Sequence, residues 1–398
     1  MITVIDSPCG YGKTSYAINM INDNPTKNFV YITPFLDEVG RVIDSTRYAD
    51  GTPRLKQPTK EKTKMENLNR LLDNADDIAS THALFKGCTS EIINKCRQYT
   101  LILDEVMSVV EQVSDLTKDD VATILNKKFA HIDKETSLLI WDAENYNGRF
   151  NDIKAMCKQK HIFIVNGIAL IWTFPVEIFE AFQDIYICTY MFDAQIQKYY
   201  YDMYGIEYVK KSVNNGELIP YVAQKGKTEL INILEGSKIN SIGDTKTALS
   251  KNWYLKNIDM YHTIKKGMIN YIKNIVPKIT NTPVRSCDVL WTTYKDFQSN
   301  LAGKGYSKSF APLNCRATNQ YINRYVVMYM ANIFINPIIE HFFKEHNVNI
   351  DQDKYALAEL IQFIYRTRIR EDKEIYCYIP SKRLRELLID YCENLTFD

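Results

Sequence analysis

The chain has 398 residues, of which 45% are hydrophobic and 24% are charged, a composition typical of a globular protein long enough for two domains. Its 49 Lys and Arg residues nearly balance 48 Asp and Glu residues, which excludes a polybasic coat, so contact with nucleic acid would have to come from a local groove. The 9 cysteines form no CxxC pair, a pattern typical of reduced thiols rather than of a disulfide framework or a zinc site. No apolar run approaches ~18 residues and no charged leader precedes an apolar segment, so we expect no membrane span, no signal peptide and a cytoplasmic location.

The first half of the chain alternates short β-branched runs with polar stretches of helical pattern. Apolar runs separated in this way predict parallel strands buried on both faces of an α/β sheet. A Gly-, Lys- and Asn-rich interval at 210–229 follows and predicts hairpins or a connection. The runs are residues 2–5, 29–34, 77–82, 100–105, 137–142, 161–166 and 184–190.

The second half predicts another α/β lobe. The patterns favour helices at 261–276, 319–345 and 382–395, and strands at 287–294, 309–314 and 374–381. We therefore expect an N-terminal lobe at 1–195, a connecting and accessory segment at 196–285, and a C-terminal lobe at 286–398.

A nucleotide site is predicted at residues 7–15, SPCGYGKTS, which lie between an apolar run and a helical pattern. Gly10 and Gly12 can adopt positive φ and let backbone amides approach a phosphate, where the start of a helix favours negative charge. Lys13 would reach the β- and γ-phosphates, and the Thr14 hydroxyl would bind Mg²⁺.

Ser7 stands where the GxxxxGK[ST] pattern has its first glycine. That position closes the turn and supplies no amide to the anion, so a small residue can replace glycine there. We expect the loop from Ser7 to Ser15 to bind ATP, with Mg²⁺ as the second cofactor.

An acidic pair follows the apolar run 100–103. Asp104 would hold Mg²⁺ directly or through water, and Glu105 would polarise the attacking water as a general base. An acidic pair after a strand is also common in surface turns. Its combination with the phosphate loop favours hydrolysis over binding alone.

Several segments are similar, in the same order, to the motifs of superfamily 1 and 2 helicases. The chain most resembles the DEAD/DEAH-like superfamily 2 helicases encoded by bacteriophages, over nearly its whole length. This resemblance implies two RecA-like P-loop lobes, each a mostly parallel sheet flanked by helices, with ATP hydrolysed at an interlobe cleft to move along or unwind nucleic acid. The segments are SPCGYGKT (motif I), VYITPFLDEV at 30–39 (Ia), ASTHALF at 79–85 (Ib), LDEV at 103–106 (the DExx box), FAPLNCRATNQY at 310–321 (V) and ELIQFIYRTRIR at 359–370 (VI).

Motif VI also has a physical reading. Gln362, Arg366 and Arg370 are spaced by four, so they share one face if the segment is helical. An arginine that stabilises charge on the γ-phosphate in the transition state is called an arginine finger. Either Arg366 or Arg370 could be such a finger. The family form places its last arginine where this chain has Ile369, and a solvated basic helix end is the alternative interpretation.

The resemblance also implies contacts with a nucleic-acid backbone. Thr33, Thr81 and His82 are the candidates on the first lobe, and Arg316 and Asn319 are those on the second. Single-stranded DNA is the expected partner, RNA is the alternative, and phage replication or recombination proteins are further partners in a host cytoplasm.

A basic stretch at 54–64, RLKQPTKEKTK, is a further candidate clamp for a nucleic-acid backbone, with a solvated loop as the alternative. Two other functions stay open for the whole chain. One is a non-translocating nucleotide switch or inhibitor, and the other is a packaging-type, terminase-like ATPase, which predicts clustered acidic metal ligands in the second half.

Overall fold

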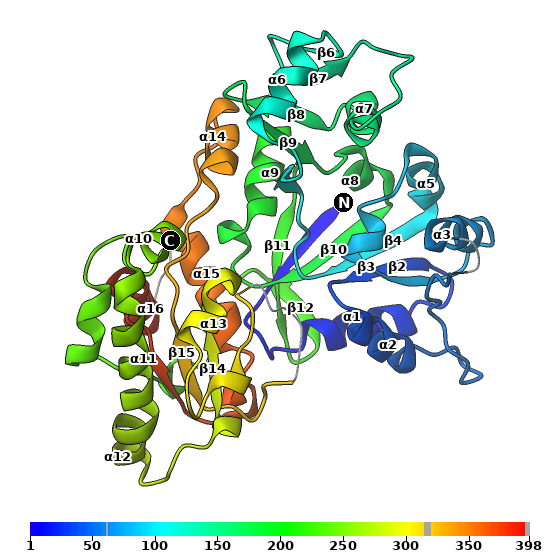
Figure 1. The fold of residues 1–398 in the computed structure, drawn as a ribbon. Coiled ribbons are helices and arrows are strands. Elements are labelled where there is room, and N and C mark those ends of the chain that lie inside the picture. The colour runs from blue at the N-terminus through cyan, green and yellow to red at the C-terminus, as the bar shows by residue number, and fades with distance from the viewer. Residues whose placement is uncertain (61–62, 314–319, 395–398) are drawn as a thin grey trace. The chain divides into compact units, whose positions relative to one another are not determined.

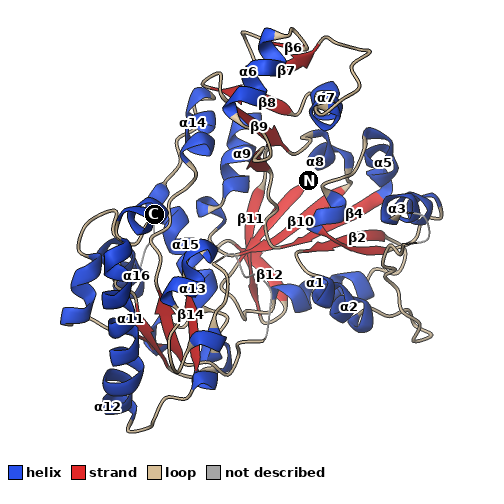
Figure 2. Ribbon diagram, in the orientation of Figure 1, coloured by secondary structure: helices blue, strands red, loops and turns tan. Residues whose placement is uncertain are grey.

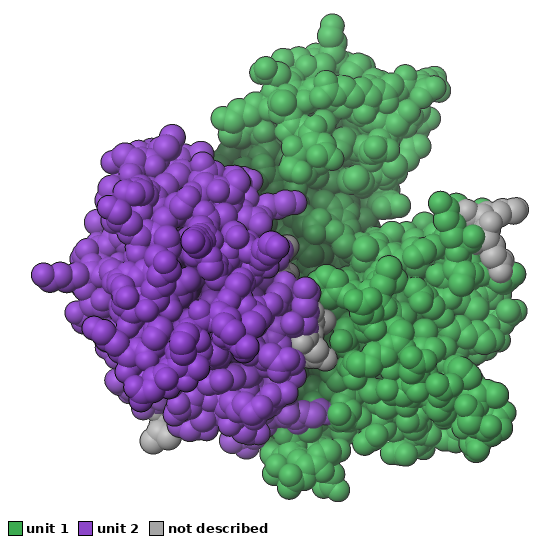
Figure 3. Space-filling view, turned by 60° about the horizontal axis from the view of Figure 1, so that its bottom comes forward, with its two compact units in different colours: residues 1–6, 13–220, 335–351 green, residues 7–12, 221–334, 352–398 purple. Residues whose placement is uncertain are grey.

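The computed structural model describes residues 1–60, 63–313 and 320–394, and the chain divides into two compact units (Figure 3). Unit 1 comprises residues 1–6, 13–220 and 335–351, and unit 2 comprises the rest. The segment that sequence analysis assigned to a connection, 196–285, is therefore divided between the units at residue 220. The loop 7–12 groups with unit 2, where the Tyr11 hydroxyl donates to the Lys225 carbonyl at 3.4 Å.

Unit 1 contains a seven-stranded sheet in the order β12-β11-β1-β10-β4-β2-β3 (Figure 2). Its strands pair in parallel except for the antiparallel hairpin of β11 and β12, which confirms the hairpin expected after residue 210. Five of the predicted runs are strands of this sheet. The strands are β1 (Ile2–Asp6), β2 (Asn28–Thr33), β3 (Ile78–Thr81), β4 (Tyr99–Asp104), β10 (Asp184–Thr189), β11 (Val209–Asn214) and β12 (Glu217–Pro220).

Both faces of this sheet are buried because successive side chains alternate between them. Ile5 and Ile102 pack with α1 and α2 on one face, and Val4 and Leu101 belong to a larger apolar cluster on the other. The helices of the unit are α1 (Lys13–Asn22), α2 (Leu36–Ser45), α3 (Lys64–Asp73), α4 (His82–Phe85), α5 (Ser90–Lys95), α8 (Glu177–Ala181) and α9 (Ile196–Tyr204).

A smaller module lies between β4 and β10 in sequence. Two runs in it form strands as predicted, but the prediction that they join the parallel sheet is wrong. The runs at 137–142 and 161–166 form antiparallel ladders instead of joining the parallel sheet. Asn166 and Gly167 both have positive φ and turn the chain back into a hairpin, the turn that an Asn-Gly pair between apolar runs favours. The module contains β5 (Val110–Gln112), α6 (Lys118–Asn126), β6 (Ala130–Ile132), β7 (Leu139–Trp141), α7 (Asn151–Lys158), β8 (Ile162–Val165) and β9 (Ala169–Thr173).

Unit 2 contains a four-stranded, all-parallel sheet in the order β13-β16-β15-β14. The strands expected at 287–294 and 374–381 and the helices expected at 261–276 and at the end of the chain are confirmed. The strands are β13 (Ile231–Ile233), β14 (Val289–Thr292), β15 (Val326–Tyr329) and β16 (Ile375–Tyr378). The main helices are α10 (Lys251–Lys256), α11 (Tyr261–Asn270), α12 (Val276–Thr280), α13 (Gln298–Leu301), α15 (Gln352–Ile364) and α16 (Lys382–Glu393).

The helix predicted at 319–345 is wrong. Its middle is β15, whose four side chains are all buried, and only α14 (Pro337–Glu345) is helical at its end. In the run predicted as a strand at 309–314, the described residues 309–313 form no strand, and Phe310 makes an isolated bridge to Trp291. A short apolar run fits a buried helix or a buried strand equally well, so tertiary packing determines which of the two forms.

Helix α14 belongs to unit 1, although it follows β15 of unit 2 in sequence. The Phe342 and Phe163 rings lie 5.2 Å apart, and the Asn336 side-chain amide donates to Gln112 Oε1 at 2.8 Å, so the helix covers the antiparallel module. Among the helices in the described part of the chain, none is long and apolar enough to cross a membrane.

Candidate functional site

The carboxyl ends of parallel strands β1, β10, β4 and β2 meet at one edge of the unit 1 sheet. Asp104 is the last residue of β4, and α1 begins at Lys13 directly after the glycine-rich loop. The Thr14 hydroxyl donates to Asp104 Oδ1 at 3.5 Å. The structure thus brings together the two predicted Mg²⁺ ligands, from segments 90 residues apart in sequence.

The loop before α1 has the backbone that an anion requires. Gly10 and Gly12 have φ of +88° and +85°, which L side chains rarely adopt. A Cβ built at either position meets no atom within 4 Å, so open space lies beside this backbone. The residues present therefore fit a phosphate group, with Lys13 at the start of the helix behind it.

Asp104 is buried, and burial raises its pKa to about 6, with the neighbouring charge of Glu105 acting in the same direction. The positive charge of Lys13 acts against this rise. A buried carboxylate of this kind is favoured by a cation beside it, because the cation offsets the lost hydration of the charge.

Glu105 has a backbone conformation that is rare for a residue with a side chain, with φ of +76°. Its amide donates to the Cys188 carbonyl at 2.9 Å, which holds the turn after β4 against β10. Strained positions of this kind are frequent at functional sites, where the surrounding structure stabilises them.

Three buried polar atoms at this edge have no hydrogen-bond partner among the described residues. They are Glu105 Oε2, Thr189 Oγ1 at the end of β10, and Thr33 Oγ1 at the end of β2. Buried polar atoms in proteins are almost always hydrogen-bonded, so their concentration at one edge calls for a physical reason. A polar ligand bound at the edge supplies one.

Asp6 is a component of this edge that sequence analysis missed. It ends β1, and its carboxylate accepts hydrogen bonds from the amides of Met191 and Phe192 at 2.8 and 3.0 Å. Burial raises its pKa, while these two bonds lower it. Asp6 therefore ties the segment after β10 to the strand before the loop. The signal was present, since Asp6 ends an apolar run as Asp104 does.

The residues of the motif VI segment lie in unit 2, and they do not share one helix. Helix α15 ends at Ile364, so the argument from spacing by four does not apply to Arg366 and Arg370. The Arg366 Nε donates to the Gln362 carbonyl at 3.0 Å, and the Arg370 Nε donates to the Tyr365 carbonyl. Both side chains are thus oriented by local backbone.

Of the candidate nucleic-acid contacts, Thr33 and Thr81 pair in register at the ends of β2 and β3. Thr33 is fully buried, whereas Thr81 and His82 are half-buried. The other two candidates, Arg316 and Asn319, lie outside the described residues.

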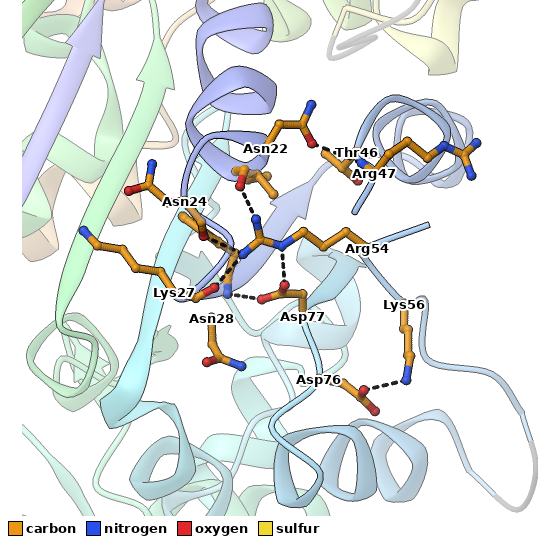
Figure 4. A network of polar contacts seen from close by, with 12 residues as sticks. Asn22, Asn24, Lys27, Asn28, Thr46, Arg47, Arg54, Lys56, Asp76 and Asp77 are labelled. Atoms are coloured by element: carbon orange, nitrogen blue, oxygen red, sulfur yellow. Dashed lines mark hydrogen bonds and ion pairs between the residues drawn. The ribbon is translucent and has the colours of Figure 1, made fainter. Parts of the chain in front are cut away.

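The first residue of the basic stretch 54–64 has a structural role (Figure 4). Arg54 is 1% exposed, and its Nε donates to Asp77 Oδ2 at 2.6 Å. Its other nitrogens donate to the backbone carbonyls of Ile21, Asn24 and Lys27. Arg54 is therefore not available to a nucleic acid, and the clamp predicted for this stretch is wrong at that residue.

Comparison with known proteins assigns the chain to a family. It is 39% identical to the SPbeta prophage-derived uncharacterized protein YonV of Bacillus subtilis (strain 168), over 416 aligned residues that cover 99% of each protein. The chain belongs to the YonV family. The model of the YonV C-terminal Rossmann-like domain matches residues 225–392, and that of the YonV middle domain matches residues 110–172, which are the antiparallel module. The prophage origin of the relative agrees with the phage origin that the resemblance implied.

Two solved structures are similar to this member of the YonV family over nearly its whole length. Xpd4 of S. tokodaii has 12% identity and a TM-score of 0.50, with 98% of this chain and 93% of that chain covered. An apo XPD structure has 10% identity and a TM-score of 0.51, with coverage of 98% and 95%. At these identities the likeness shows the fold, which is the predicted one: two RecA-like lobes, each with a mostly parallel sheet flanked by helices.

Proposed function

We propose that this chain is an ATP-dependent nucleic-acid motor of the superfamily 2 helicase type. The observation that carries the proposal is the contact of Thr14 with Asp104 beside Glu105, whose buried Oε2 has no partner among the described residues. Gly10 and Gly12 would hold the phosphates of ATP, and Lys13 would neutralise the β- and γ-phosphates. Bound Mg²⁺ would supply positive charge to the phosphates, held by Thr14 and Asp104.

Glu105 is the proposed general base. Its strained backbone and the bond from its amide to Cys188 fix the carboxylate at the edge of the sheet. There it would orient a water molecule and accept its proton as the water attacks the γ-phosphate. The role requires the carboxylate to be ionised, and the site offers the unpartnered Oε2 for the water.

The second unit would contribute to the same reaction through Arg366 or Arg370, with Gln362 beside them. The finger would be the residue whose replacement by Lys lowers turnover at least about tenfold while nucleotide affinity is kept, because an arginine finger acts on the transition state. Separate Arg366→Lys and Arg370→Lys variants, compared by single-turnover hydrolysis and by nucleotide titration, distinguish the two. If neither lowers turnover, motif VI does not supply a finger.

The substrate of the motor is proposed on the likeness to the XPD structures and on the prophage relative. We infer translocation on single-stranded DNA in a host cytoplasm, with phage replication or recombination proteins as partners. RNA is the alternative track. Thr81 and His82 at the end of β3 would contact the backbone.

The experiment is ATP hydrolysis by the full chain with and without single-stranded DNA or RNA. The wild type is expected to hydrolyse ATP faster with nucleic acid, and Lys13→Ala is expected to lose nucleotide binding and hydrolysis together. Lys158→Ala, an exposed lysine of α7, is the matched control and should behave as the wild type. Hydrolysis without stimulation would contradict the motor, and ATP binding without hydrolysis would favour a nucleotide switch.

A further inference from the structure

A second charged region lies in unit 2 and contains none of the residues that the proposed function uses. Residues 260–287 contain no Asp or Glu in a chain whose charges otherwise balance. The same segment contains five basic residues, Lys265, Lys266, Lys273, Lys278 and Arg285. The net charge of the chain does not reveal this local excess of basic residues, because it gives no information on how charge is distributed.

The structure places much of this segment in one helical column (Figure 1). Helix α11 continues through a π-helical turn at Tyr271–Ile275 into α12. The side chains of Ile264, Met268 and Tyr271 pack into the core of the unit, whereas those of Lys266 and Lys273 are exposed. The apolar face of the helix is thus already used, and a basic face remains outside.

His262 and Lys266 lie four residues apart, about one turn along α11, and Lys273 follows in the π-helical turn; all three side chains are exposed. We call these three residues the basic row. Among the described residues, neither Lys266 nor Lys273 makes an ion pair, in contrast to Lys251 of α10, which lies 2.8 Å from Asp296. Within residues 1–60, 63–313 and 320–394, no carboxylate therefore neutralises these two lysines.

The row stands on a rigid support. A Cβ at Gly267 would lie 2.8 Å from the Tyr378 hydroxyl, so the helix approaches β16 as closely as a glycine permits. The Tyr271 and Tyr378 rings lie 5.2 Å apart, and the Tyr378 hydroxyl donates to the Ile239 carbonyl at 2.8 Å. Packing of this kind fixes where the lysines emerge, which lowers the entropy lost on binding.

We propose that the basic row binds the phosphate backbone of duplex DNA, as a site separate from the one that binds nucleotide. The proposal rests on the proposed function for the class of ligand. Two exposed lysines, with the polar side chains of His262, Thr263 and Asn270 beside them, offer positive charge and hydrogen-bond donors to phosphate groups. The site would hold duplex DNA near the motor without reading its sequence.

Two other partners fit the row less well. Single-strand binding uses exposed aromatic side chains on which bases stack, and Tyr261 and Tyr271 of this column are buried. Binding to an anionic membrane uses an apolar helix face inserted between lipids. The apolar face of α11 packs against β16 and its neighbours, and the exposed apolar side chains Ile258 and Ile279 lie before α11 and in α12 rather than along α11. Binding to the phosphates of a duplex requires only the positive charge of the lysines.

The test is the Lys266→Glu/Lys273→Glu variant of the full chain. Its matched control is Lys134→Glu/Lys158→Glu, which makes the same change in net charge at two exposed lysines of the antiparallel module. Fluorescence anisotropy with a labelled 20-base-pair duplex, without nucleotide and over a range of salt concentrations, measures affinity. We expect the variant to bind at least about tenfold more weakly than the wild type, with the slope of log K against log salt reduced by about two. The control is expected to bind as the wild type does.

The outcomes separate this site from the proposed function. Basal ATP hydrolysis should be equal in the wild type and the Lys266→Glu/Lys273→Glu variant, because the row takes no part in nucleotide binding. Equal duplex affinity in the variant and its control would overturn the basic row even if hydrolysis is present. So would a variant that loses affinity only for oligothymidine, or only for vesicles of anionic phospholipid, or a wild type that binds no duplex at all.

Discussion

In each unit, polar residues lie at the carboxyl edge of a parallel sheet. The hydrogen bonding of these residues differs between the two units. At the carboxyl edge of the unit 2 sheet, the Thr293 hydroxyl and the Tyr254 hydroxyl both donate to the Met330 carbonyl, at 3.0 and 2.7 Å. The Asn332 side chain beside them donates to the carbonyls of Lys246 and Ala248 at 2.9 and 3.0 Å. Thr292 Oγ1 and, after β13, Asn240 Oδ1 are exceptions, with no partner among the described residues.

At the matching edge of unit 1, Thr33, Glu105 and Thr189 each keep a buried oxygen without a partner among the described residues. The two sheets thus differ in the hydrogen bonding at their carboxyl edges. Several polar side chains at the unit 2 edge donate to backbone carbonyls, whereas three buried oxygens at the unit 1 edge have no partner among the described residues. In an open parallel sheet, the topology gives a location where a ligand site can form, at the carboxyl ends of the strands. The side chains at that edge determine whether a ligand can bind there.

The comparison makes Glu105→Gln the variant with the largest expected effect. Gln has nearly the shape of Glu and keeps the strained backbone, but it cannot take a proton. ATP hydrolysis should fall by about 100-fold or more while nucleotide affinity changes little. Single-turnover hydrolysis and equilibrium titration with a fluorescent ATP analogue measure the two quantities.

A second variant tests the electrostatics of the open edge. The Asp104 carboxyl has a pKa of about 6 in the folded chain against 3.8 for an unperturbed group, so between these values the folded state binds more protons than the unfolded state. The free energy of unfolding contributed by this group therefore falls as pH rises through that window. Asp104→Asn removes the charge and should be more stable than the wild type at pH 7, by about 1–3 kcal/mol.

Denaturant unfolding in EDTA without nucleotide checks this prediction. The advantage of Asp104→Asn should grow as pH rises through the window between the two pKa values, 3.8 and about 6, and level off above it. An advantage that does not depend on pH would mean that packing, and not the buried charge, separates the two proteins.

The smallest predicted effect is also the most direct comparison of the two edges. Thr189 and Thr293 are both fully buried, but of the two hydroxyls only that of Thr293 has an acceptor among the described residues, the Met330 carbonyl. Thr293→Val should lower the free energy of unfolding by about 1 kcal/mol because a hydrogen bond is lost. Thr189→Val should leave it unchanged or raise it, because no bond is lost and an unsatisfied hydroxyl is removed. Equal losses in the two variants would show that the edges do not differ as described.

Much of the candidate site could be predicted from local sequence. Gly10 and Gly12 adopt the positive φ that their place in the loop requires, and Asp104 ends its strand as expected. These features depend on a few consecutive residues, and parallel strands then bring their carboxyl ends to one edge. Asp6 ends an apolar run in the same way, but it lies just before the motif I segment, which begins at Ser7.

Other features depended on contacts between distant segments. The sequence pattern of β15 fits a helix, and the residues form a strand because β14 and β16 pair with them on either side. Helix α14 joins a module that ends more than 160 residues earlier in the chain. Arg54 stood in a basic stretch, and only the fold gave it Asp77 and three carbonyls to bond.

The sequence by itself therefore determined the loop, the acidic pair and the strands that present them, because backbone conformation and burial on both faces leave a local pattern. Tertiary structure decided which apolar runs pair in parallel, which charges are buried, and where a helix stops. Those outcomes depend on what packs against a segment, and its own residues do not specify that.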